Sequence, residues 1–287
     1  MDAAADCERR IAFRISILAS GSSGNATLLE TQHTTLLVDA GLGRKEIQRR
    51  FEALGRALPE RVDGILVTHE HSDHSSGLPQ MQREWDCPAY LTELTHREIQ
   101  KMLADENAER PEARKKKLER VEYIRAGERF EIGEIEITPF SIPHDAADPV
   151  GFAVRSDGTK AAIVTDLGYL PELVKHHLRE ADFLILESNH DLDMLKMGPY
   201  PWYIKQRVMS RTGHLSNAVV SEFLADAEVF DGRARHLVLG HLSEQNNTPE
   251  IAEIFANQAL DQRSPEFAFH GALHIATQRT PLGPFEV

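Results

Sequence analysis

Short apolar runs separated by turn-forming residues dominate the first part of the chain. A helix interrupts them, because Ile47, Phe51 and Leu54 fall on one face at helical spacing and Gly55 follows as a stop. Stretches such as GSSGN and QH are typical of turns between strands. Four runs are predicted as strands: 13–20, 26–31, 34–41 and 62–69.

Two further regions follow with different patterns. Residues 95 to about 120 predict a charged helix with a solvated face, and a second β-rich block extends from 121 to 168. Strands and helices then alternate, and Ser216 and Thr248 suit helix N-caps. The alternating elements are predicted at 170–179 (helix), 182–188 (strand), 216–229 (helix), 235–241 (strand) and 248–260 (helix).

The order of these elements predicts the fold class and the domain organisation. β-rich runs followed by helices, repeated once, indicate two packed sheets with helices outside. The chain shows no short repeat, no low-complexity tract and no long linker. We therefore expect one domain over residues 13–287, preceded by a flexible N-terminal segment, residues 1–12.

Composition excludes several classes of protein. The 287 residues include 45 acidic and 32 basic side chains, and a net charge of −13 disfavours a non-specific nucleic-acid coat protein. Only Cys7 and Cys87 are present, so a disulfide framework or a cysteine-rich zinc site is excluded. We see no secretory signal and no apolar run long enough to cross a bilayer. We expect a cytoplasmic protein without a membrane partner.

The stretch ILVTHEHSDHSSG, residues 65–77, carries the strongest chemical signal. His69 and His71 are two residues apart, so an extended segment projects both in the same direction, and Asp73 and His74 follow around the next turn. Imidazole and carboxylate groups are ligands of zinc and manganese. Four such ligands would fill the coordination sphere of a single ion and leave no position for water or substrate. Two neighbouring ions with shared ligands are therefore the more natural design.

Three more candidate ligands end apolar runs elsewhere in the chain. His144 stands in SIPHD, Asp166 in AIVTDLG and His241 in LVLGHLSEQNN. Each alone would more often be a structural residue. Together, and each at a predicted strand end, they indicate one shared site, since sites commonly form where strands end.

These motifs resemble the metallo-β-lactamase superfamily, whose hallmark is His-x-His-x-Asp-His after a strand. The segments LASGSSGNATLLE, LLVDAGL, VTHEHSDHSSGL, ESNHD, GHLSN and LGHLSEQNNTPE are similar to the WalJ/YycJ-type branch of bacterial DNA-processing hydrolases, over roughly residues 13–275. The resemblance implies an α/β fold: a four-layer αββα sandwich of two mixed β-sheets with outer helices. It also implies a binuclear site at one edge of the sheets.

The resemblance implies a role for each motif residue. Asp39, in LLVDAG, matches the family's structural aspartate, which orients the histidines from behind, although a plain turn former is the alternative. The ligands would divide between two ions as follows: His69, His71 and His144 on one, Asp73, His74 and His241 on the other, and Asp166 bridging both.

Two metal ions suggest a mechanism. Ions roughly 3.5–4 Å apart lower the pKa of a bridging water and stabilise charge on the attacking and leaving oxygens. We expect Zn²⁺ or Mn²⁺, with Fe²⁺ as a further option, a metal-bridging hydroxide as nucleophile, and Asp73 among the catalytic residues. His214, in TGHLSN, is the candidate proton donor to the leaving oxygen. The alternative is a structural histidine at the start of a helix, beside the Ser216 cap.

Residues 200–211, YPWYIKQRVMSR, bear on the substrate. Aromatic residues interleaved with basic ones just before His214 are typical of a nucleic-acid track. An amphipathic helix with Ile204 and Val208 in the core is the alternative, and both interpretations can hold. The candidate substrate contacts are Lys205, Arg207, Arg211, Ser216 and Asn217.

Three functional hypotheses follow. The first is a metal-dependent phosphodiesterase that degrades DNA as an exonuclease, in which DNA rests on the resemblance alone. The second is a small-molecule hydrolase of a lactone, thioester or cyclic phosphodiester, which the acidic charge favours. A non-catalytic binding module is the third, and it is disfavoured because every expected ligand position is filled.

Overall fold

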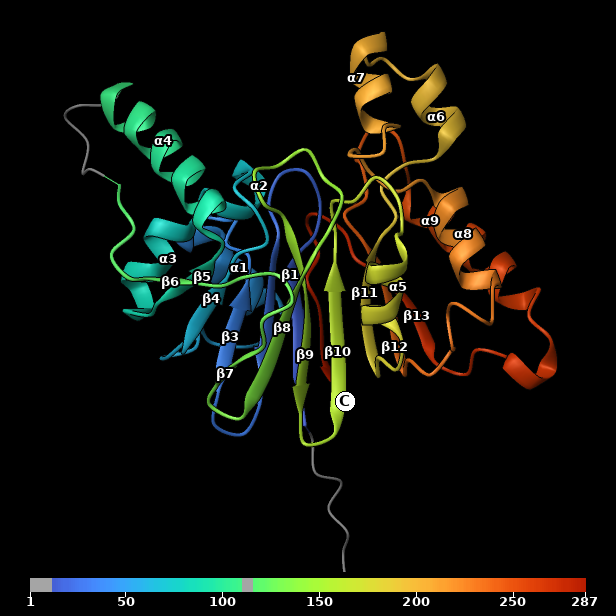
Figure 1. Ribbon diagram of the computed structural model, residues 1–287, viewed down its shortest axis with the longest axis horizontal. Coiled ribbons are helices and arrows are strands. Elements are labelled where there is room, and N and C mark those ends of the chain that lie inside the picture. Colours follow the sequence, from blue (N-terminus) through green and yellow to red (C-terminus); the bar gives the residue numbers. More distant parts are fainter. Residues whose placement is uncertain (1–11, 110–115) are drawn as a thin grey trace, which may run out of the picture.

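The computed structural model describes residues 12–109 and 116–287, and the predicted N-terminal segment, residues 1–12, lies outside this range except for Ala12. Ala12 is buried, and its N–H donates to the carbonyl of Val287. Two sheets stand face to face in the middle of the molecule, with helices on both outer sides (Figure 1).

Each sheet contains seven strands among the described residues. The first sheet has, in spatial order, β14 (Leu282–Glu286), β1 (Arg14–Ala19), β2 (Ala26–Glu30), β3 (Thr35–Val38), β4 (Gly64–Leu66), β5 (Ala89–Leu91) and β6 (Val121–Tyr123). The second has β13 (Ala272–Ile275), β12 (His236–Gly240), β11 (Phe183–Glu187), β10 (Thr159–Val164), β9 (Val150–Ser156), β8 (Ile135–Ser141) and β7 (Phe130–Ile132).

Both sheets are mixed in the same way. Strands β14 to β3 and β7 to β10 pair antiparallel, whereas β3 to β6 and β10 to β13 pair parallel. The helices are α1 (Arg44–Ala53), α2 (Ser72–Ser75), α3 (Leu78–Trp85), α4 (Glu93–Glu109), α5 (Glu172–Leu178), α6 (Leu192–Met197), α7 (Trp202–Val208), α8 (Asn217–Ala225), α9 (Pro249–Asp261) and the 3-10 turn η1 (Pro265–Phe267). None of the helices that the structure describes is long and apolar enough to cross a membrane.

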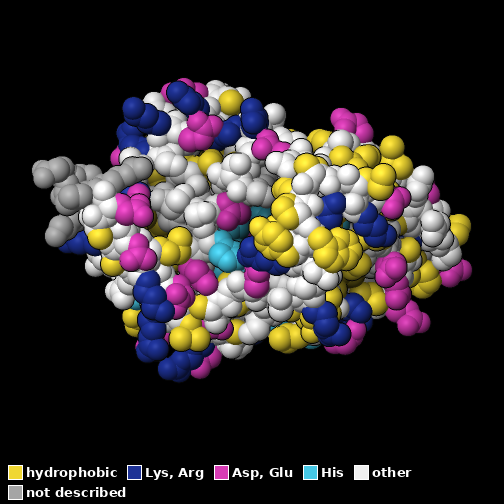
Figure 2. All heavy atoms as spheres, turned by 90° about the horizontal axis from the view of Figure 1, so that it is seen from above, with side chains coloured by type: hydrophobic (Ala, Val, Ile, Leu, Met, Phe, Trp, Pro, Cys, Tyr) yellow, Lys and Arg dark blue, Asp and Glu magenta, His cyan; other side chains and the backbone are white. Residues whose placement is uncertain are grey.

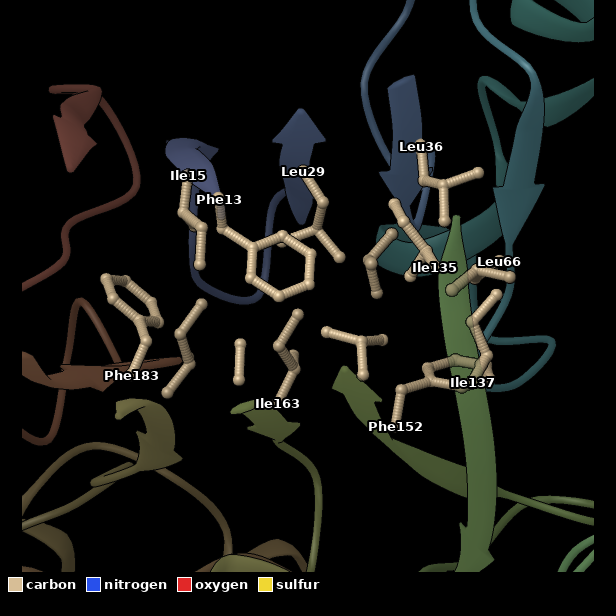
Figure 3. Packing of buried hydrophobic residues seen from close by; sticks show 14 of the residues in the cluster. Phe13, Ile15, Leu29, Leu36, Leu66, Ile135, Ile137, Phe152, Ile163 and Phe183 are labelled. Atoms are coloured by element: carbon tan, nitrogen blue, oxygen red, sulfur yellow. The ribbon is translucent and has the colours of Figure 1, made fainter. Parts of the chain in front are cut away.

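The two-residue period of the strands divides their side chains between the central core and the outer layers. Figure 3 shows Ile15 and Leu29 of the first sheet pointing toward Phe152, Ile163 and Phe183 of the second. The large central residues are fully buried, so each contributes on the order of 1.5–3 kcal/mol of hydrophobic stabilisation.

The alternate residues face the helices. Leu37 and Ile65 pack beneath α1, α3 and α4, whereas Leu184 and Leu237 pack beneath α5, α8 and α9. The predicted four-layer sandwich of two mixed sheets with outer helices is therefore confirmed.

Several predicted boundaries were wrong. Helix α4 is described as far as Glu109, and residues 110–115 of the predicted helix lie outside the described residues, but residues 116–120, predicted as helical, are not helical. Helix α8 ends at Ala225 rather than 229, because Asp226 Oδ1 accepts the N–H of Glu228 in a turn that competes with the helix. The predicted caps Ser216 and Thr248 are confirmed, since their side chains accept N–H groups from the first turns of α8 and α9.

Candidate metal centre

The candidate ligands meet at one edge of the two sheets. The parallel strands β3 and β4 of the first sheet end there, as do β8, β10 and β12, which run in one direction in the second. Asp39 follows β3, the histidine motif follows β4, and His144, Asp166 and His241 follow β8, β10 and β12. Figure 2 shows histidine side chains on the floor of a hollow at this edge, with acidic side chains beside them. The structure therefore brings together all the residues predicted as ligands.

One group of donors consists of His69, His71 and His144. His71 Nδ1 lies 3.1 Å from His69 Nε2 and 3.2 Å from His144 Nε2. His69 is fully buried, and burial is the main reason that its pKa is well below the usual value. A neutral imidazole with an available nitrogen is the form that binds a metal ion.

A second group consists of Asp73, His74 and His241. Asp73 Oδ2 lies 3.4 Å from the Nε2 atoms of both histidines. Asp166 lies between the two groups: its Oδ2 is 3.0 Å from His74 Nε2, and its Oδ1 is 3.4 Å from His241 Nε2 and 3.9 Å from His144 Nε2. This arrangement suits a carboxylate shared by two ions.

The donors of this centre fit divalent metal ions. Imidazole and carboxylate donors suit zinc, manganese and iron. Asp166 Oδ2 is buried, and the group 3.0 Å from it, His74 Nε2, is itself a candidate metal donor. Burial by itself would raise the pKa of Asp166, but His241 and His74 beside it hold that pKa well below the usual value. The carboxylate is therefore charged and available to a cation.

Three of these residues adopt an unusual backbone conformation. Asp39, Asp166 and His241 have φ angles of 60°, 61° and 53°, in the left-handed region that residues other than glycine seldom adopt. Asp39 and His241 stand directly after β3 and β12, and Asp166 stands two residues after the end of β10. Such strain is typical of functional sites, where the surrounding structure holds a side chain in a required position.

Asp39 lies beneath the histidine motif and contacts His74 and Thr68. Its Oδ2 accepts from His74 Nδ1 at 2.7 Å, and its Oδ1 accepts from the Thr68 N–H at 2.8 Å. The Thr68 hydroxyl also lies 3.0 Å from His69 Nδ1. These contacts fix the rings from behind and leave their Nε2 atoms facing the other donors.

Glu187 is a residue of this centre to which the sequence pattern assigned no role. This fully buried carboxylate ends β11, and its Oε1 lies 2.8 Å from His214 Nδ1 and 3.0 Å from His241 Nδ1. Its Oε2 accepts the N–H groups of Leu167 and Leu215. Burial would raise the pKa of Glu187, but the adjacent His214 and His241 lower it to about 2. Glu187 is therefore ionised and orients two histidines at once.

His214, the predicted proton donor, adjoins the donor groups. Its side chain is 22% exposed, and Nδ1 lies 3.5 Å from Asp166 Oδ1. Burial lowers the pKa of His214, but the charge of Glu187 and the hydrogen bond to it outweigh burial, so the pKa is raised. A histidine at the rim of the site whose pKa is raised holds its proton more readily than a free imidazole and is placed to donate it.

The GSSGN loop before β2 supports the centre through Asn25. Asn25 Nδ2 lies 3.0 Å from His74 Nε2, and its N–H donates to the carbonyl of Asp73. The loop N–H groups of Gly21, Ser23 and Gly24 donate to acceptors within the protein. These bonds favour a tight turn over a cradle for phosphate.

The predicted substrate contacts occupy different environments. Arg207 pairs with Asp145, next to His144, and the exposed Arg211 stacks 4.2 Å above the Tyr169 ring. Both guanidinium groups therefore lie near the rim of the site.

The other three have structural partners. Lys205 is buried, and its ammonium donates to the carbonyls of Lys196 and Gly198. Asn217, 1% exposed, bonds Ser188 and Asn247, and the Ser216 hydroxyl accepts from Val219. This geometry does not support a direct contact of Lys205 or Asn217 with substrate. Ile204 and Val208 are only half-buried.

Comparison with known proteins agrees with the geometry. Residues 34–242 match the family model of the beta-lactamase superfamily domain. The chain is 37% identical over 249 residues to exodeoxyribonuclease YycJ of Bacillus anthracis, which covers 86% of this chain and 89% of that protein. It is also 37% identical over 252 residues to exodeoxyribonuclease WalJ of Streptococcus pneumoniae, with 88% and 90% covered.

A solved structure shows the same fold. The metallo-beta-lactamase fold protein YhfI from Bacillus subtilis superposes with a TM-score of 0.64 at 17% identity, over 94% of this chain and 99% of that one. The chain therefore belongs to the beta-lactamase superfamily, has the metallo-β-lactamase fold, and is a member of a family of metal-dependent hydrolases.

Proposed function

We propose that this protein is a binuclear metal-dependent phosphodiesterase that degrades DNA as an exonuclease in the cytoplasm. The observation that carries the proposal is the position of Asp166 between the His69–His71–His144 group and the Asp73–His74–His241 group. Two relatives with 37% identity are named exodeoxyribonucleases, which supports DNA as the substrate.

The two donor groups would each hold one divalent ion, zinc or manganese, with iron as a further option. Such ions supply a nucleophilic water at neutral pH and neutralise charge that develops on the phosphate oxygens. Asp73 belongs to the catalytic set through its place in the second group. Asp39 and Thr68 would keep His69 and His74 in the tautomers that present Nε2 to the ions.

His214 would deliver the proton that the leaving oxygen needs. The bond between His214 Nδ1 and Glu187 Oε1 directs the other ring nitrogen, Nε2, away from Glu187. Glu187 favours the protonated ring, so His214 would hold its proton until the leaving oxygen, as it gains negative charge, accepts it. In this arrangement His214 is the general acid, and the buried carboxylate of Glu187 sets the orientation of its ring.

The test is hydrolysis by protein loaded with Mn²⁺ or Zn²⁺. Parent protein and His69→Ala would be offered end-labelled single-stranded and duplex DNA, RNA, a lactone, a thioester and bis(p-nitrophenyl) phosphate. Release of nucleotides from DNA by the parent, abolished in His69→Ala, is the expected result. Turnover of only a small ester would favour the small-molecule hydrolase, which the net charge of −13 also suits. No turnover by metal-loaded protein would overturn both.

A further inference from the structure

Helices α6 and α7 form a projection beside the metal centre. Both rise above the strand ends at the top of Figure 1, and Figure 2 shows hydrophobic side chains gathered next to the histidines. Three of the large exposed hydrophobic residues belong to this projection: Met197 at 88%, Trp202 at 62% and Tyr203 at 69% exposed. A group of exposed apolar side chains rimmed by polar residues is typical of an interaction site.

The charge of this region differs from that of the rest of the chain. Acidic residues number 45 among 287; in the projection Asp193 lies in the first turn of α6, but residues 194–221 contain no acidic residue. The same stretch contains Lys196, Lys205, Arg207 and Arg211. Lys205 is buried, but the other three are exposed. A locally cationic surface on an acidic protein attracts a polyanion, whereas the acidic remainder of the surface would repel it.

The projection is held firmly against the metal centre. Lys205 joins α7 to the carbonyls at the end of α6, and Asp191 caps the start of α6 through the N–H groups of Asp193 and Met194. Arg207 pairs with Asp145, which follows the ligand residue His144. The exposed aromatic rings are therefore kept at a fixed place relative to the donors, as a positioned subsite requires.

We propose that Trp202 and Tyr203 form a stacking platform for unpaired nucleobases of the DNA strand, so that the protein acts on single-stranded or frayed ends in preference to blunt duplex. The proposal rests on the nuclease function and deepens it by naming the form of the substrate. Aromatic rings stack on the face of any base and therefore bind single strands of any sequence. Paired bases are stacked inside the duplex, where their faces are not accessible. Arg207 and Arg211 would meet the phosphates that connect the stacked bases.

The platform makes a quantitative claim about affinity. Replacing an aromatic ring that stacks on a base typically raises the Kd about tenfold or more. Stacking releases no counterions, so its loss should leave the slope of log Kd against log salt unchanged. Loss of a phosphate contact, as in Arg211→Ala, should reduce that slope by about 1.

The test measures binding of phosphorothioate DNA to the metal-loaded protein by fluorescence anisotropy. The DNA is a duplex with a single-stranded tail, prepared with normal bases or with abasic sites in the tail. Parent protein should bind the normal tail about tenfold more tightly than the abasic tail. Trp202→Ala/Tyr203→Ala should bind both alike, at the weaker level and with an unchanged salt slope.

Two control variants separate stacking from altered structure. Trp202→Phe/Tyr203→Phe keeps the rings and should retain most of the affinity. Phe267→Ala removes an equally exposed ring, 52%, from η1 on another part of the surface and should change nothing. Metal content is measured for each variant.

The outcomes distinguish the two proposals. Equal binding of normal and abasic tails by a parent that degrades DNA overturns the platform and leaves the nuclease function standing; so does undiminished affinity in the double alanine variant. A parent that hydrolyses no DNA overturns both. If the aromatic surface instead binds a protein, the bases of the tail will make no difference to affinity.

Discussion

Glu187 Oε1 is shared by His214 and His241, at 2.8 Å and 3.0 Å from their Nδ1 atoms. One histidine is the proposed proton donor and the other a proposed metal ligand. A single buried oxygen therefore sets the orientation of both, and a change at Glu187 should affect proton transfer and metal binding together.

Glu187→Gln should lower metal affinity or activity by about 10–100-fold, as replacement of a buried partner of a ligand usually does. The amide of glutamine would place an NH₂ group where the carboxylate has an oxygen. That group cannot accept the hydrogen bonds that the oxygen accepts from the histidines or from the backbone N–H groups of Leu167 and Leu215. We expect a loss of about 1–3 kcal/mol in unfolding free energy. Glu136→Gln, on the outer face of the second sheet, is the control. Full activity with bound metal in Glu187→Gln would contradict the positioning role.

His214→Ala should slow DNA cleavage by about 10²–10⁴-fold while the bound metal stays in place. Bis(p-nitrophenyl) phosphate has a leaving group that needs no proton, so its turnover should fall much less. Comparing kcat on the two substrates, together with elemental analysis, checks the prediction. Equal losses on both substrates, or loss of metal, would rule out a proton-donor role.

Metal removal should destabilise the fold. A site loaded at a hundredfold above its Kd adds about 2.7 kcal/mol, so a chelator should lower Tm on the order of 5–10 °C. Without cations, the carboxylates of Asp39, Asp166 and Glu187 are buried near one another, and their mutual repulsion is not offset by metal charge. Asp166→Asn, which lacks the shared carboxylate, should show a much smaller chelator effect by scanning calorimetry. An identical shift in both proteins would argue against Asp166 as a ligand.

Gly41→Ala should disrupt the second donor group. A Cβ atom at Gly41 would lie 1.7 Å from the carbonyl oxygen of Asp73, so the Asp73 backbone must move. Such overpacking costs about 1–3 kcal/mol or more, and metal content should fall with it. Gly43→Ala, two residues later, places its Cβ 3.4 Å from a Gln80 side-chain oxygen and should be nearly neutral. Normal metal content in Gly41→Ala would refute this prediction.

Lys160 should make stability depend on alkaline pH. Burial, with repulsion from Arg155, lowers the pKa of Lys160 from 10.5 to about 8. Between these values the unfolded chain keeps a proton that the native protein has released, so this contribution to stability rises with pH. Below pH 8 the native protein carries the full penalty of the buried charge.

Lys160→Met should therefore be more stable than the parent at pH 7, and the difference should shrink as pH rises from about 8 toward 10.5. Urea unfolding of both proteins at several pH values measures the difference. A difference that does not change with pH would show that the lysine is not held in a depressed state.

The sequence predicted the layers of the fold but not the edge strands β13 and β14 of its two sheets. Alternation in segments such as residues 13–20 predicts strands because every second side chain enters the central core. Strands β13 and β14 were missed, since Ala272–Ile275 is short and Leu282–Glu286 contains glycine and proline. Pairing with β12 and β1 makes them strands, and a local pattern does not contain that information.

The site was predictable where a motif concentrates ligands and unpredictable where contacts are distant in sequence. Glu187 meets partners 27 and 54 residues later, and nothing in ESNHD distinguishes it from its polar neighbours. Lys205 stands in a basic and aromatic run that predicts contact with phosphate, yet the register of α7 turns it inward. Whether Lys205 faces the interior or the solvent depends on the register of the helix. In a helix as short as α7, tertiary contacts determine that register.

Neither sheet alone contains the metal centre. The motif residues His69, His71, Asp73 and His74 follow the first sheet, whereas His144, Asp166 and His241 follow the second. If the two sheets had formed but not yet docked, neither the His69–His71–His144 group nor Asp73, His74 and His241 would be complete. The proposed hydrolytic activity should thus appear only after the two sheets have docked, and a misassembled copy would be inactive.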